Sequence, residues 1–136
     1  MMGLLCVGAG GALGAMGRYG LGLIPLAPEL PLMTLLINFL GSVAIGAIVE
    51  VSELAAGALP REAVLFLKVG LCGGFTTFST FSLETLELIE GGQYAIAGAY
   101  ALVSVVLCVA YWSEKRSPVR SCRQARRQKS RVGGLG

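Results

Sequence analysis

The chain has 136 residues, of which 54% are hydrophobic, and its formal net charge is +3. Its mean hydropathy of +0.73 is typical of a membrane protein, because soluble domains are only about 45–50% apolar. It contains no histidine and no aspartate, which argues against histidine catalysis, most zinc sites and paired-carboxylate chemistry. We therefore do not expect an enzyme.

Four apolar runs approach the length of about 20 residues that a helix needs to cross a bilayer. In chain order they are Leu4–Ile24, Leu32–Val49, Ala63–Leu83 and Tyr94–Trp112. The first run lacks a basic start, and the later runs attach the chain to a membrane in any case, so we do not interpret it as a signal peptide. The pattern predicts an all-α integral membrane protein with one four-helix domain over residues 1–112.

The first run contains small residues and one charge. Gly10 and Gly14 are four residues apart, a spacing at which helix backbones approach closely in membranes. Arg18 lies about two turns before the end of the run. It either extends to the membrane interface as an anchor or faces a water-filled vestibule that attracts anions, and its position alone leaves both open.

The second and fourth runs carry polar residues at helical spacing. Thr34, Asn38 and Gly41 with Ser42 share one face of the second run. The Asn38 amide is either an interhelical hydrogen bond worth about 0.6–2 kcal/mol or a donor to an anion. Tyr100, Ser104 and Tyr111 form a stripe on the fourth run. Ordinary packing would also explain each of these residues.

The third run contains the string GGFTTFSTF at residues 73–81. Each glycine costs a helix about 1 kcal/mol relative to alanine, and the Thr and Ser side chains compete for backbone hydrogen bonds. We therefore expect the third helix to be broken at its centre. Carbonyls freed there must be satisfied by protein, water or a cation. Phe75, Phe78 and Phe81 recur every third residue, and the positive edges of such rings can face an anion.

Residues 113–136 differ in composition from the rest of the chain. They hold eight of its eleven basic residues: Lys115, Arg116, Arg120, Arg123, Arg126, Arg127, Lys129 and Arg131. We predict a disordered tail that meets anionic lipid in the cytoplasm rather than nucleic acid, which places both termini there. The cysteines (Cys6, Cys72, Cys108 and Cys122) are widely spaced, which is typical of small buried side chains rather than of a disulfide framework.

GGFTTFSTF, together with INFLGS in the second run and GALGAMGRYG in the first, closely resembles the CrcB/Fluc family of fluoride channels over roughly residues 3–112. The resemblance implies an antiparallel dual-topology-type dimer in the cell inner (plasma) membrane, with two fluoride pathways and a structural sodium ion at the dimer centre. It also implies passive, electrogenic export of fluoride, which lowers cytoplasmic fluoride and its toxicity.

The resemblance also assigns roles to individual residues. The backbone carbonyls of Gly73 and Thr76 would bind sodium, and Arg18 would lie at the vestibule. Phe75 would not face the pore, and the role of Glu84, the acidic position after the phenylalanines, stays open. The residues expected to form the fluoride pathway are Asn38, Phe78, Phe81, Tyr100, Ser104, Thr77, Thr80 and Thr34.

Alternatives remain open at this point. The basic residues of the tail bias its orientation, so the chain could be one half of a heterodimer with a paired homologous subunit rather than a homodimer. A coupled fluoride transporter is the nearest rival function. It would usually show a titratable residue in mid-membrane, and the sequence places its glutamates outside the apolar runs or at their ends. A multidrug-type cation exporter would need a membrane-embedded glutamate, which the first run lacks.

Overall fold

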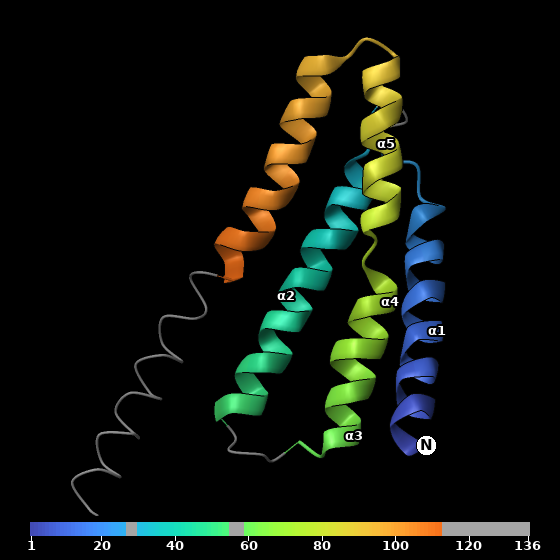
Figure 1. Ribbon diagram of the computed structural model, residues 1–136, viewed down its shortest axis with the longest axis vertical. Helices are drawn as coiled ribbons and strands as arrows, with labels where there is room; N and C mark the ends of the chain where they lie inside the picture. The colour runs from blue at the N-terminus through green and yellow to red at the C-terminus, as the bar shows by residue number, and fades with distance from the viewer. Residues whose placement is uncertain (27–29, 55–58, 113–136) are drawn as a thin grey trace, which may run out of the picture.

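The computed structural model describes residues 1–26, 30–54 and 59–112, and these ranges contain helices and no strand (Figure 1). The helices are α1 (Met2–Gly22), α2 (Leu32–Leu54), α3 (Arg61–Val64), the π-helix η1 (Leu65–Cys72), α4 (Gly73–Phe75) and α5 (Phe78–Glu90). A last helix covers Tyr94–Trp112. The predicted basic tail lies outside the described residues.

Three helical stretches in the described ranges are long and apolar enough to cross a membrane: Leu32–Ser52, Arg61–Glu90 and Tyr94–Trp112. The helix α1 has 21 residues, but its many glycines and Arg18 make it less apolar than these three. The all-helical membrane architecture predicted from the sequence is therefore present, and the fourth span stays a prediction. The third stretch is longer than the predicted run, because the helix continues past Leu83 to Glu90.

Helix α1 packs along η1 and α4 through glycines (Figure 1). Gly10 and Gly14 are its buried residues. A Cβ atom added to Gly10 would lie 2.9 Å from Leu71 N, and one added to Gly70 would lie 2.8 Å from Val7 O. Backbone thus contacts backbone along the glycine seam, by which we mean Gly10, Gly14, Gly70 and Gly74. The close approach predicted for Gly10 and Gly14 is confirmed.

The helical conformation ends at Thr76 and Thr77. Thr76 has φ −79° and ψ 155°, and Thr77 has φ −146° and ψ 114°, so both are extended. Gly73 and Gly74, which we expected to interrupt the helix, are helical themselves. Gly74 is needed for another reason, because its Cβ position is occupied by the backbone of Gly11. The interruption therefore belongs to the two threonines.

A tight turn after α5 reverses the chain. Gly92 has φ 75°, which favours glycine, and it directs the Tyr94–Trp112 helix back along the molecule (Figure 1). This helix packs against α2, where Tyr111 meets Phe39 edge to face with ring centroids 6.2 Å apart. Cys6, Cys72 and Cys108 are free thiols, and Cys72 is buried. Cys122 lies outside the described residues.

Candidate functional site

Asn38 of α2 holds the extended backbone of Thr77 with both ends of its amide. Its Nδ2 donates to Thr77 O at 3.0 Å, and its Oδ1 accepts from Thr77 N at 2.8 Å. We call this pair of hydrogen bonds the amide clamp. It satisfies two backbone groups in the middle of an apolar stretch, where lipid offers no partner. The second Nδ2 hydrogen is left for another acceptor.

The clamp and the cap of α5 redirect two amides away from carbonyls of the third stretch. In a continuous helix Thr77 N would bond Gly73 O, but here it bonds Asn38. Thr80 N would bond Thr76 O, but it donates to Thr77 Oγ1 at 3.1 Å. The intervening Gly74 O accepts from Arg18 Nε at 3.4 Å. Gly73 O and Thr76 O are thus two of the carbonyls at the break whose α-helical donors bond other acceptors.

Hydroxyl groups surround the break. Thr77 Oγ1 caps α5 and also bonds Thr80 Oγ1 at 2.9 Å, with Ser79 Oγ at 3.2 Å. Thr76 Oγ1 donates back to Cys72 O at 3.0 Å, which keeps it on the last turn of α4. The hydroxyls of Thr77 and Thr80 are therefore engaged with each other.

A cavity of about 360 Å³ lies beside the break. It is lined by Asn38, Ser42, Ile45, Thr76, Thr77, Phe78, Phe81, Ser104, Val105, Cys108 and Val109. Ser104 is only 8% exposed, and its Oγ has no hydrogen-bond partner among the described residues. A buried hydroxyl without a partner is costly, so this donor favours an acceptor that enters the cavity. We call this space the central cavity.

Aromatic rings form a continuous row from this cavity. Phe78 and Phe81 have ring centroids 5.5 Å apart, and Phe81 and Tyr100 have centroids 5.2 Å apart. Phe78 is 78% exposed in the single chain, whereas Tyr100 is 6% exposed. The row therefore runs from an uncovered surface at Phe78 into the packed interior at Tyr100.

Glu84 of α5 joins two other helices at the buried end of this row. Thr34 Oγ1 of α2 donates to Glu84 Oε1 at 2.7 Å, and Tyr100 OH donates to Oε2 at 2.8 Å. Thr34 and Tyr100 are each 6% exposed. We call these three side chains the carboxylate bridge.

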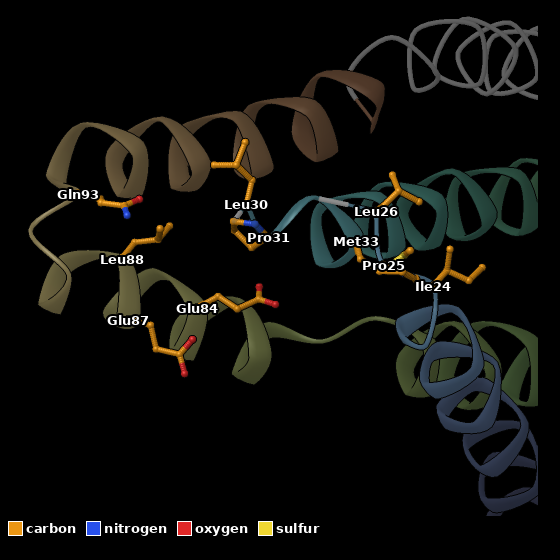
Figure 2. Close-up of a pocket in the computed structure, with 10 residues that line it drawn as sticks. All are labelled: Ile24, Pro25, Leu26, Leu30, Pro31, Met33, Glu84, Glu87, Leu88 and Gln93. Carbon is orange, nitrogen blue, oxygen red and sulfur yellow. The ribbon is translucent and has the colours of Figure 1, made fainter. Parts of the chain in front are cut away.

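A second cavity of about 390 Å³ lies at the end of the helices (Figure 2). We call it the end cavity, and its lining residues are Ile24, Pro25, Leu26, Leu30, Pro31, Met33, Glu84, Glu87, Leu88 and Gln93. Figure 2 shows Glu84 and Glu87 on α5 with their carboxylates pointing in different directions. Glu84 thus belongs both to this cavity and to the carboxylate bridge.

The structure distributes the sequence-predicted residues over three places. Asn38, Thr77, Phe78, Phe81 and Ser104 line the central cavity. Thr34 and Tyr100 meet at Glu84, and Thr80 lies behind Thr77. Arg18 instead reaches the break from α1, at Gly74.

Sequence analysis did not find that Glu84 connects three helices. We expected glutamates only outside the spans or at their ends, and the structure does not test this expectation because it fixes no membrane boundary. The chain remains helical beyond Leu83, so Glu84 lies inside the stretch Arg61–Glu90. A signal was present, because Phe78, Phe81 and Glu84 follow at steps of three residues and so share one face of α5.

These features define an all-helical membrane protein that keeps a hydroxyl- and ring-lined break between apolar helices. The sequence pattern of the family described as "CrcB-like protein, Camphor Resistance (CrcB)" matches residues 5–113. The chain therefore belongs to the CrcB-like family.

Curated relatives carry a more specific name. A protein named fluoride-specific ion channel FluC from Granulibacter bethesdensis is 57% identical over 76 residues, which are 56% of this chain and 59% of the relative. FluC 1 of Nitrobacter hamburgensis is 51% identical over 76 residues, covering 56% of this chain and 60% of the relative. FluC of Nitrobacter winogradskyi is 53% identical over the same shares. The chain thus spans about 60% of the length of the relatives it matches.

Proposed function

We propose that this protein is a fluoride-selective channel that lets fluoride leave the cytoplasm by passive, electrogenic flux across the inner (plasma) membrane. The names of the curated relatives support fluoride as the permeant ion. The observation that carries the proposal is the buried Ser104 hydroxyl, which has no acceptor among the described residues and lines a cavity with two phenylalanine rings. A small, hard anion would satisfy this donor while ring edges face it without a fixed positive charge.

The pathway would continue from the central cavity along the polar side chains toward the end cavity. Ser104 and Tyr100 are one turn apart on the same helix, and Tyr100 contacts Phe81. Asn38 retains one N–H for an anion while it holds Thr77. Arg18, at the break on the side of α1, would supply positive charge at the vestibule.

A structural sodium ion fits the carbonyls of the break. Sodium is a hard cation that prefers oxygen ligands, and backbone carbonyls form such sites in channels. The amides that would bond Gly73 O and Thr76 O in a continuous helix donate elsewhere, which supports these two carbonyls as its ligands. The described residues contain no group of three or more His, Cys, Asp or Glu side chains that could hold a metal, but a carbonyl site needs none. When bound, the ion would supply positive charge beside the break.

A second subunit would complete this site. Gly73 is exposed in the single chain and lies near the middle of the stretch Arg61–Glu90. Lipid offers no hydrogen-bond partner to a backbone carbonyl at this depth, so a second protein surface over Gly73 would satisfy it. We propose an antiparallel dimer of four-span subunits in which α1, packed along η1, is the fourth span. The partner is either a second copy or a homologous subunit inserted in the opposite orientation, because the basic tail favours cytoplasmic termini for this chain.

The test is fluoride efflux from liposomes that contain only the purified chain, with and without valinomycin to carry potassium. Fast efflux that requires valinomycin is expected for an electrogenic channel and would also show that one type of subunit suffices. No efflux from a folded sample would contradict a homodimeric channel. Efflux restored by co-expression with a homologous subunit would then identify a heterodimer.

A coupled fluoride transporter is the second candidate, and one observation favours it. Glu84 is a titratable group held inside a membrane-spanning stretch by two buried hydroxyls. Groups of this kind carry protons in coupled transporters. Efflux that is fast without valinomycin would favour this mechanism over the channel.

A further inference from the structure

Cys108 places a thiol in the wall of the central cavity. It lies on the Tyr94–Trp112 helix, one turn after Ser104, and both residues line this cavity. The Cys108 side chain is half-buried, whereas Cys72 is only 3% exposed. Neither Cys6 nor Cys72 lines the central cavity or the end cavity. Among the three cysteines that the structure describes, Cys108 is therefore the one that a small molecule in these cavities would meet.

The Cys108 thiol can lose its proton without leaving a buried acceptor unpaired. Its Sγ donates to Asn38 O at 3.8 Å, and a thiol is a weak donor. Asn38 O also accepts from Ser42 Oγ at 2.9 Å, which is the stronger hydrogen bond. Asn38 O keeps this hydroxyl donor when the thiol is deprotonated. Replacing the thiol proton by a metal ion thus removes only a weak contact.

Ser104 gives an independent indication that the central cavity takes a ligand. It is 8% exposed, and its Oγ has no hydrogen-bond partner among the described residues. A hydroxyl carries one hydrogen to donate and two lone pairs to accept, so its oxygen can also face a cation. Ser104 and Cys108 are four residues apart on one helix and therefore share a face. A sulfur and an unpartnered oxygen thus border the same space.

The lining of the cavity selects the kind of cation. None of the described residues that line it is charged, so the thiolate itself must balance the charge of a bound ion. Thiolates prefer soft metal ions, and a singly charged soft cation on one thiolate forms a neutral pair. Zinc needs more ligands than one, and the described part of the chain has no group of three or more His, Cys, Asp or Glu side chains.

We propose that Cys108 is an inhibitory modification site that takes a soft, singly charged cation of the organomercury class. The S–H bond breaks and a sulfur–mercury bond forms, while the proton and the displaced water leave to the solvent, with no change of oxidation state. The bound group fills the cavity beside Phe78, Phe81 and Ser104, so an anion cannot pass. The block of flux rests on the proposed channel function, but the binding of the cation does not.

The test is fluoride efflux from liposomes that contain the full chain, before and after treatment with methylmercury. Mercury in this ion has one open position, so a single thiolate satisfies it. We expect wild-type efflux to fall to the protein-free background and to return after excess dithiothreitol. Cys108→Ser should keep its own untreated rate under the same treatment, and Cys108→Ala takes its place if the serine variant does not conduct. An equal fractional loss in wild type and variant would overturn the proposal.

A matched control asks whether another thiol causes the block. The double variant Cys6→Ser with Cys122→Ser retains Cys72 and Cys108. Its efflux should be as sensitive to methylmercury as that of wild type. If the double variant were insensitive, the block would belong to Cys6 or Cys122, and the assignment to Cys108 would be wrong.

The mass of the intact protein separates binding from conduction. Wild type treated with methylmercury should carry one more mercury group per chain than Cys108→Ser, and an equal number in both would refute the site. Wild type that shows no efflux, alone or with a homologous subunit, but carries this additional group would refute the channel and still support the site. Efflux that stays complete while Cys108 carries mercury would refute the block.

Discussion

Adding a methyl group at Gly14 should weaken the contact between α1 and the third stretch. Its Cβ would lie against Leu71 O, 2.7 Å from Phe75 N and 3.1 Å from Gly74 C. All three are backbone atoms, so no side-chain rotation can relieve the overlap. Gly17→Ala is the matched control one turn later on α1, because its Cβ would meet only the Phe75 ring at 3.7 Å, an ordinary contact.

The expected magnitude follows from these distances. Carbon atoms pack best at about 3.5–4.0 Å, so the helices must separate by roughly 1 Å, which forfeits up to half of the local dispersion energy. Overpacking of this kind costs about 1–3 kcal/mol, and a rigid backbone contact favours the upper end. Alanine recovers about 1 kcal/mol of helix propensity in both variants. We therefore expect Gly14→Ala to be about 2 kcal/mol less stable than wild type and Gly17→Ala to be equal or more stable.

The assay is reversible unfolding in mixed micelles, with the free energy of unfolding compared among wild type and the two variants. A loss of about 2 kcal/mol raises the equilibrium constant for unfolding about 30-fold. If Gly14→Ala and Gly17→Ala agree within about 0.5 kcal/mol, the two backbones do not touch at Gly14, and the glycine seam does not exist as described.

Three further predictions concern the break and its cavity. Ser104→Ala should lower the rate of fluoride efflux about tenfold, because one net hydrogen bond of about 1.4 kcal/mol is lost. The control Ser82→Ala lies on an exposed face and should leave the efflux rate unchanged. Equal rates in the two variants would contradict a role for Ser104. Asn38→Asp keeps the acceptor for Thr77 N but places a carboxylate oxygen against Thr77 O. The free energy of unfolding in micelles should therefore fall by about 1–3 kcal/mol, and an unchanged value would refute the amide clamp. The Cβ atom added by Gly73→Ala would meet nothing within 4 Å in the single chain, so the variant subunit should still fold. In the proposed dimer the same atom would meet the partner, so the variant should dimerise more weakly in analytical ultracentrifugation. An equally strong dimer would show that Gly73 lies outside the interface.

Periodicity and small-residue spacing predicted the contact surfaces well. Thr34, Asn38 and Gly41 lie on one face of α2 and meet Glu84, Thr77 and Thr76, respectively. These predictions succeed because a helix has a fixed geometry, so residues three or four apart must share a face whatever surrounds them.

The position of the break could not be predicted from local propensity. Gly73 and Gly74 are poor helix formers, yet they are helical. Contact with Gly11 of α1 requires a residue without a side chain at Gly74, and this benefit outweighs the cost in propensity. The break follows where Asn38, from another helix, offers Thr77 two hydrogen bonds, and such a partner does not appear in the local sequence.

The π-helical turns of η1 were also beyond sequence analysis. The residues Leu65–Cys72 form a short, mostly apolar run whose pattern fits any helix, and nothing in it signals the wider winding of the segment that packs along α1. The length of the third stretch was missed for a different reason. A hydrophobicity pattern ends at the first polar residues, although Glu84 has two buried hydroxyl partners that allow it to lie inside the helix bundle.

The two sides of the break share α2 as a neighbour and differ in the other helix that each contacts. The half before it is joined to α1 through the glycine seam and through Arg18 at Gly74 O. The half after it is joined to the Tyr94–Trp112 helix and to α2 through Glu84. Helix α2 contacts both sides, and its Asn38 fixes Thr77 between them. Because Phe78, Phe81 and Glu84 lie on the same helix after the break, any displacement of α5 would move the two rings and the carboxylate together.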